Sequence, residues 1–121
     1  MIKPIQRLNG DYQVSEAVGY EIMGSFMIVL AYLVISGKTT TPTKDPGAQA
    51  ICIGAASAVI FYTSFSVTRG GLNPFMVFGH AVYRSIDIGD SSPFDYIYIY
   101  LIFPPIGALI ALVLHRFVLL P

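Results

Sequence analysis

The feature that most restricts this chain is a set of three apolar runs, each about 20 residues long, at positions 17–36, 48–67 and 96–114. This is the length that an α-helix needs to cross roughly 30 Å of hydrocarbon. Backbone N–H and C=O groups must pair within such a segment when lipid surrounds it, so the runs predict helices. The sequence therefore predicts an all-α membrane protein with transmembrane helices at about 17–36, 48–67 and 96–117.

The composition agrees with this class and excludes others. Hydrophobic residues make up 55% of the 121 positions and charged residues 12%, whereas a soluble domain carries roughly 25% charged residues. The formal net charge is +0, so we expect no nucleic-acid partner. Cys52 is the single cysteine, which rules out an intrachain disulfide, and we expect it to be a buried structural thiol.

Residues for catalysis or metal binding do not gather in this sequence. His80 and His115 lie far apart, and neither has a second ligand at metal-binding spacing. We expect His115 to reach toward the lipid headgroups. Asp87, Asp90 and Asp95 lie in a loop without the twelfth-position Glu of a calcium site. The sequence predicts no enzyme activity, no metal and no cofactor other than bound lipids.

The segment 1–16 is polar and carries Asp11 and Glu16. It lacks the short apolar core of a secretory signal and the acid-poor, Ser-rich composition of a transit peptide. We therefore expect a polar N-terminal segment rather than a cleaved leader.

A short apolar stretch between the second and third runs has an unusual beginning. The sequence TRGGLNPFMVFGH at 68–80 places Gly70, Gly71, Asn73 and Pro74 directly after a membrane-length run. Residues 73–83 would make a helix of roughly 16 Å, about half a bilayer. Asn followed by Pro is a favoured helix start. The sequence predicts a re-entrant loop and half-helix at 68–83.

Glu21 is the ionisable residue that lies well inside an apolar run. A charged carboxylate at the bilayer centre costs about 2.5–3.5 kcal/mol on insertion scales, so it needs hydrogen-bond donors. The peptide N–H groups at 70–72 lack helical partners, and we expect them to bind Glu21. The alternative is that Glu21 lies shallow enough to reach the headgroups.

Small residues recur at helical spacing in two runs. Ala50, Gly54 and Ala58 would line one face of the second helix, and Gly107 and Ala111 repeat the pattern in the third. Such stripes let neighbouring backbones approach closely, so we expect partner subunits in the membrane. Most tyrosines, a group that includes Tyr20, Tyr62, Tyr96 and Tyr100, fit aromatic belts near the run ends.

These segments together resemble the second half of an aquaporin, of the major intrinsic protein family. YEIMGSFMIVL is similar to the first helix of that half, and FPPIGALIALVLHRF to its last helix. TRGGLNPFMVFGHAV resembles the loop and half-helix, and it keeps Asn73, Pro74, Phe78 and Gly79. The resemblance covers about residues 16–118 and implies an aquaporin-like half-module at 17–118.

The chain also departs from this family. An aquaporin contains two such halves with the pore between them, so one half is not expected to enclose a pore. The resemblance places Met76 where the family has its filter Arg, Phe75 in place of Ala, and Phe61 where water-selective members often carry His. Arg69 stands where Gly is common. Met76 and Phe61 thus replace two polar pore-lining groups and remove hydrogen-bond partners from the expected lumen, or they simply fill space in a packed interior.

Two functions follow from the resemblance and its departures. The favoured one is an accessory or structural subunit of a larger membrane complex that does not conduct by itself, with other membrane subunits and lipids as partners. The alternative is half of a water or small-solute channel that pairs with a second half, encoded elsewhere or supplied by a second copy. Lys and Arg are nearly balanced between the two ends, which leaves both orientations open. The expected location is the mitochondrial inner membrane.

Overall fold

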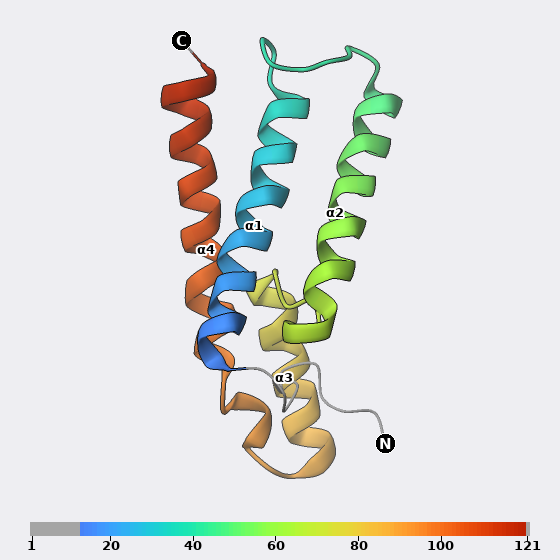
Figure 1. Ribbon diagram of the computed structural model, residues 1–121. Coiled ribbons are helices and arrows are strands. Elements are labelled where there is room, and N and C mark those ends of the chain that lie inside the picture. Colours follow the sequence, from blue (N-terminus) through green and yellow to red (C-terminus); the bar gives the residue numbers. More distant parts are fainter. Residues whose placement is uncertain (1–12, 121) are drawn as a thin grey trace.

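The computed structural model describes residues 13–120. Four α-helices follow one another in this range: α1 (Val14–Ser36), α2 (Pro46–Thr68), α3 (Pro74–Ile88) and α4 (Ile97–Leu114) (Figure 1). A 3₁₀ turn, η1 (Ser92–Phe94), precedes α4, and a π-helical turn, η2 (His115–Leu119), continues it. α1, α2 and the segment Ser92–Leu119 are long and apolar enough to cross a membrane. The predicted all-α fold with three spanning helices and a shorter helix between the second and third is confirmed.

Local capping sets where the first two helices begin. The backbone N–H of Gln13 donates a hydrogen bond of 2.9 Å to the Glu16 carboxylate, so α1 starts at Val14 and not at the predicted position 17. The Asp45 carboxylate accepts hydrogen bonds from the N–H groups that follow Pro46, so α2 starts there and not at 48. Ser15 and Glu16 in α1, and Pro46 and Gly47 in α2, hid these turns from a prediction based on apolar runs.

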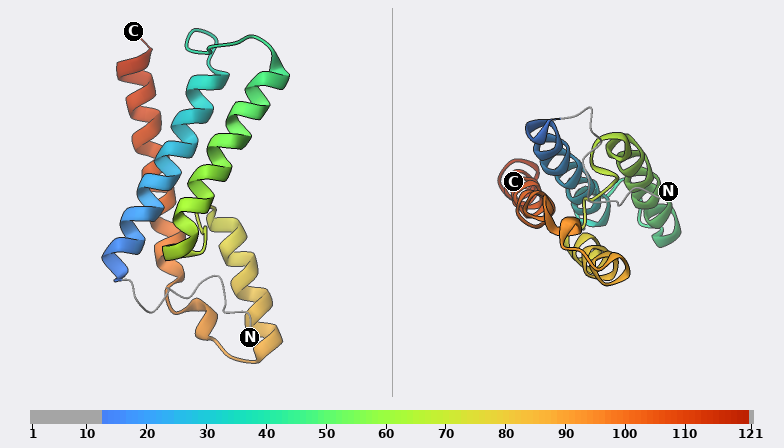
Figure 2. Two further views of the ribbon diagram at one scale, coloured as in Figure 1. Left: turned by 45° about the vertical axis from the view of Figure 1, so that its right-hand side comes forward. Right: turned by 90° about the horizontal axis from the view of Figure 1, so that it is seen from below.

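The α3 helix is longer than the predicted half-helix, which was expected to end at 83. It continues to Ile88 and ends where Gly89 adopts the left-handed conformation, with φ of 66°. Arg84 and Asp87 form an ion pair of 2.9 Å on the added turn. This part of α3 extends past the nearby ends of α1 and α2 (Figures 1 and 2). The helix therefore continues through Arg84, Ser85 and Asp87, which interrupt the apolar run without breaking the helix.

The three long helices form a curved row with α1 in the middle (Figures 1 and 2). α1 packs against both α2 and α4, whereas the two outer helices have almost no contact with each other. α3 packs against α4 and η1, on one side of the row and at the end where α2 finishes. The opposite half of that same side carries no helix (Figure 1).

The closest approach of α1 and α4 occurs at a glycine. A Cβ atom on Gly107 would overlap the carbonyl of Ile22, and Ala111 one turn further on is fully buried. This agrees with the close packing that small residues allow in membranes. In contrast, Gly54 has open space around it, and Ala50 and Ala58 are exposed.

Two sequence expectations about single residues were wrong. Cys52 is exposed on α2, because that face of α2 has no neighbour among residues 13–120. His115 is buried rather than extended toward an interface, because η2 lies against α1 near Gly37. A compact core of five buried residues connects all four helices: Ala17, Val67, Val77, Ile99 and Tyr100.

Candidate functional site

A sharp turn at 69–73 joins α2 to α3 and carries the re-entrant motif. Arg69, Gly70 and Leu72 have positive φ angles of 61°, 73° and 22°. The N–H of Asn73 donates to the carbonyl of Gly71 and closes the turn. Glycine adopts this backbone region without steric cost, which explains Gly70. The five-residue turn runs a short way back beside α2, and α3 then runs in the same direction as α2 and past its end (Figure 1).

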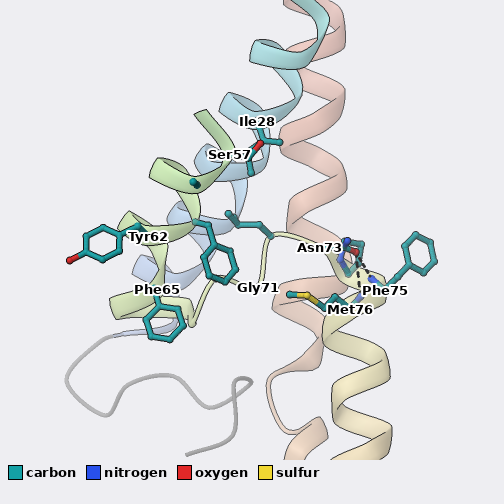
Figure 3. A pocket seen from close by; sticks show the side chains of 13 residues that line it. Ile28, Ser57, Tyr62, Phe65, Gly71, Asn73, Phe75 and Met76 are labelled. Atoms are coloured by element: carbon teal, nitrogen blue, oxygen red, sulfur yellow. Dashed lines mark hydrogen bonds between the residues drawn. The ribbon is translucent and has the colours of Figure 1, made fainter. Parts of the chain in front are cut away.

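Asn73 and Pro74 start α3 in the predicted manner. The side-chain oxygen of Asn73 accepts hydrogen bonds from the N–H groups of Phe75 at 3.1 Å and Met76 at 3.3 Å (Figure 3). Pro74 occupies the first helical position, where its missing N–H costs nothing. Asn73 is exposed, and within residues 13–120 its side-chain nitrogen donates no hydrogen bond.

The rear of the turn is tightly packed against α1 and α4. Glu21 and Tyr100 are both 0% exposed. A Cβ atom on Gly71 would overlap the Tyr100 ring and lie 3.0 Å from Glu21 Oε1. Gly71 is therefore required by the close approach of two side chains rather than by its φ angle.

The polar atoms at this rear side are close together but poorly paired. Within the described part of the chain, the two carboxylate oxygens of Glu21 make no hydrogen bond of ordinary geometry. The Tyr100 hydroxyl makes none there either. The polar groups next to the carboxylate are the Thr68 side chain and the Leu72 backbone. The Thr68 hydroxyl itself donates to the Ser64 carbonyl at 3.3 Å. The structure thus places Glu21 behind the turn, and its binding by the turn amides stays a prediction.

The front of the same turn borders an open groove of about 1040 Å³ (Figure 3). Its walls are Ile28 of α1, Ser57, Phe61 and Phe65 of α2, and residues 70–76. Asn73 and the first turn of α3 form the wall opposite α2 (Figure 3). The groove is wide enough for a ligand or a protein segment and lies beside the helix start that the motif builds.

Phe61, Phe75 and Met76, which the family resemblance assigns to the filter, lie along this groove. Phe61 and Met76 are 41% and 48% exposed, and Met76 projects toward α2 (Figure 3). Phe75 is 86% exposed at the rim of the groove, with its ring turned away from Met76 (Figure 3). The Phe61 ring packs so closely on Gly70 that a Cβ there would overlap it. Their role as altered filter positions stays a prediction, and the directions of their side chains could not be predicted from the sequence.

A second hollow was not predicted. It has a volume of about 260 Å³ and lies on the other side of Leu72 and Pro74, between α1 and α4. Ile28, Leu72 and Pro74 border both the groove and this small hollow. The turn therefore forms a ridge between two depressions on one face. Pro104 and Pro105 line the small hollow, and this proline pair inside an apolar run was the sequence feature that could have indicated it.

The two histidines and the three aspartates Asp87, Asp90 and Asp95 do not line this site. The expectation that all three aspartates lie in a loop was wrong for Asp87, which belongs to α3 and pairs with Arg84. No group of three His, Cys, Asp or Glu residues within 13–120 is arranged to hold a metal ion. His80 lies on α3 outside both depressions, and His115 lies at the far end of α4.

Comparison with known proteins gives a consistent family. The family model described as Major intrinsic protein matches residues 3–115. Probable aquaporin PIP2-8 of Arabidopsis thaliana is 29% identical over 130 aligned residues, which cover 98% of this chain and 45% of that protein. Aquaporin PIP2-1 of the same plant is 32% identical over 112 residues, 89% of this chain and 37% of that protein.

A further relative has the same pattern of coverage. Probable aquaporin PIP-type pTOM75 of Solanum lycopersicum is 27% identical over 130 residues, covering 98% of this chain and 43% of that protein. This chain thus spans less than half the length of each of these three relatives. No solved structure is significantly similar to it.

Proposed function

Because this chain belongs to the major intrinsic protein family, we propose that it supplies one half of the wall of an aquaporin-type membrane channel. It is an integral membrane protein with three membrane-length helices. The observation that supports the proposal is the open groove beside Asn73, which a second protein surface of similar fold would turn into a lumen. Lipids bind the outward apolar faces of α2 and α4.

The lining of the groove limits what such a lumen conducts. Phe61 and Met76 are apolar, and the polar side chains on its wall are those of Ser57, Tyr62 and Asn73. Few hydrogen-bond partners replace the hydration shell of an ion. The lumen that we propose therefore carries small uncharged solutes and excludes ions.

A thiol placed in the groove tests this function. In a Cys52→Ser background, Met76→Cys faces the proposed lumen and Val59→Cys, 63% exposed on α2 and outside both depressions, serves as the matched control. Osmotic swelling of vesicles from membranes that contain the chain in its native assembly is measured before and after maleimide treatment. Swelling should slow for Met76→Cys and stay unchanged for Val59→Cys. Equal swelling of treated and untreated Met76→Cys vesicles contradicts the channel.

A second candidate is the accessory subunit, in the mitochondrial inner membrane. The observation that favours it is the apolar side chains at all three filter positions, which fill space in a packed interior as well as they line a pore. In this case another membrane subunit covers the groove without leaving a lumen. Gentle detergent extraction, native electrophoresis and mass spectrometry should then find the chain in a much larger complex, and isolation of the chain alone contradicts this candidate.

A further inference from the structure

The face that carries the groove has a self-complementary shape. The turn forms a ridge with the groove on one side and the small hollow on the other. α3 occupies one half of this face, and the other half is bare (Figure 1). A two-fold axis that lies in the membrane plane would place the α3 of a second, inverted copy opposite the bare half. Two-fold interfaces are self-complementary in this sense.

Phe75 supplies the projection that such an interface needs. It is 86% exposed at the start of α3, on the side of the turn nearer to α4 (Figure 3). The small hollow, lined by Val29, Pro105 and Ala108, lies between α1 and α4. Its volume of about 260 Å³ exceeds the roughly 150 Å³ of an apolar cavity that binds benzene. The in-plane axis carries the Phe75 ring of one copy to the hollow of the other, whereas an axis along the membrane normal carries it toward α2.

The charges at the two ends allow inverted insertion. Lys38, Lys44 and Arg116 lie at the end that holds the α1–α2 loop, and Arg69 and Arg84 lie toward the other end. Lys3 and Arg7 fall outside the described residues. Orientation follows an excess of Lys and Arg on one side, and here the numbers are close.

We propose that two copies of this chain pair in opposite orientations through the groove face, with Phe75 of each copy seated in the small hollow of the other. This inference rests on the proposed function, since it names the protein that completes the lumen. The exposed nitrogen of each Asn73 would then face the other copy near the axis. The relatives, which are more than twice as long, leave room for two units of this size in one chain.

Cross-linking between differently tagged copies tests the pairing. In a Cys52→Ser background, one copy carries Phe75→Cys and the other Ala108→Cys, and both are expressed together in the native membrane. Oxidation should give a disulfide-linked product that contains both tags. The matched control pair is Val59→Cys with Leu109→Cys, 63% and 60% exposed on outward faces, and it should give little such product. Equal linking of the control pair overturns the proposal.

The other outcomes separate this inference from the proposed function. Phe75→Cys labelled with benzophenone maleimide cross-links on illumination without a second thiol. If this label links to a different protein and never to a second copy, a separate polypeptide covers the groove, so self-pairing is wrong and the half-channel stands. If it links to no protein, both proposals fail.

A topology measurement tests the same pairing without relying on Phe75. Thr39→Cys, in the exposed α1–α2 loop and again in the Cys52→Ser background, is treated with a membrane-impermeant maleimide before and after permeabilisation. Roughly half of the copies should react before permeabilisation, because both orientations are present. Complete or absent reaction before permeabilisation shows one orientation and overturns inverted pairing.

Discussion

The two sides of the turn at 69–73 are built in opposite ways. Behind it, Glu21, Thr68 and Tyr100 are fully buried, and Tyr100 and Glu21 leave no room even for a Cβ atom on Gly71. In front of it, Phe61, Phe75 and Met76 stand exposed around an open groove. One chain therefore determines the rear of the turn completely, whereas the front depends on whatever else in the membrane covers it.

The largest effect should come from the rear. Gly71→Val places atoms where the Tyr100 ring and the Glu21 carboxylate already lie, so the free energy of unfolding in detergent should fall by about 3 kcal/mol or more. Gly79→Ala is the control, because Gly79 has open space around it on α3 and alanine favours a helix by about 1 kcal/mol. Thermal unfolding measures both. If Gly71→Val melted like the unaltered chain, the rear would not be tightly packed.

The next effect concerns the buried carboxylate. Glu21→Gln should keep the fold but loosen the turn, because an amide is a weaker acceptor than a carboxylate for N–H groups such as that of Leu72. A loss of about 1.4 kcal/mol would speed hydrogen exchange of the 70–73 amides about tenfold. Glu16→Gln, exposed on the same helix, should leave these amides unchanged. Unchanged exchange in Glu21→Gln would mean that the carboxylate does not hold the turn.

A smaller effect is expected where the two sides meet. Asn73→Ala removes the acceptor at the start of α3 and should cost about 1 kcal/mol, with faster exchange of the Phe75 and Met76 amides. Asp45→Ala removes the equivalent cap of α2 and should leave those two amides unaffected. The same exchange rates in both variants would show that Asn73 does not organise the groove wall.

The front should give the smallest effect in the isolated chain. Phe75→Ala should change the free energy of unfolding of monomer in dilute detergent by less than about 0.5 kcal/mol, because the ring is largely exposed. Val77→Ala, two residues away and 1% exposed, should cost roughly 1–3 kcal/mol. If the two variants lost equal stability as monomers, Phe75 would pack within its own chain and the contrast between the two sides would disappear.

Local signals in the sequence were sufficient to predict the number and order of the helices. The apolar runs and the Asn73-Pro74 helix start each have one physical consequence, and the structure contains three long helices and the capped α3. For Glu21 the sequence left two positions open, and the structure has it buried behind the turn. The end of α3 was missed because Arg84, Ser85 and Asp87 interrupt the apolar run, although the helix continues through them to Ile88.

The remaining features of the site depend on how the helices are rotated. The sequence placed Tyr100 in an interfacial belt, and this was wrong: Tyr100 is fully buried behind Gly71, because the close contact of Gly107 with Ile22 turns this face of α4 inward. The small hollow likewise exists only once α1, α4 and the turn have met. The direction in which the Phe75 side chain points depends on how α3 is oriented, and it cannot be predicted from the residue type alone.

The central place of α1 has a consequence for how the chain assembles during synthesis. Among the described helices α1 emerges first, and it is the helix on which both α2 and α4 pack. When α2 and α4 enter the bilayer, the helix on which each of them packs has therefore already been inserted. Neither depends on a helix that has not yet been synthesised. The order of the sequence is also a workable order of insertion, which leaves the groove face as the last surface to be covered.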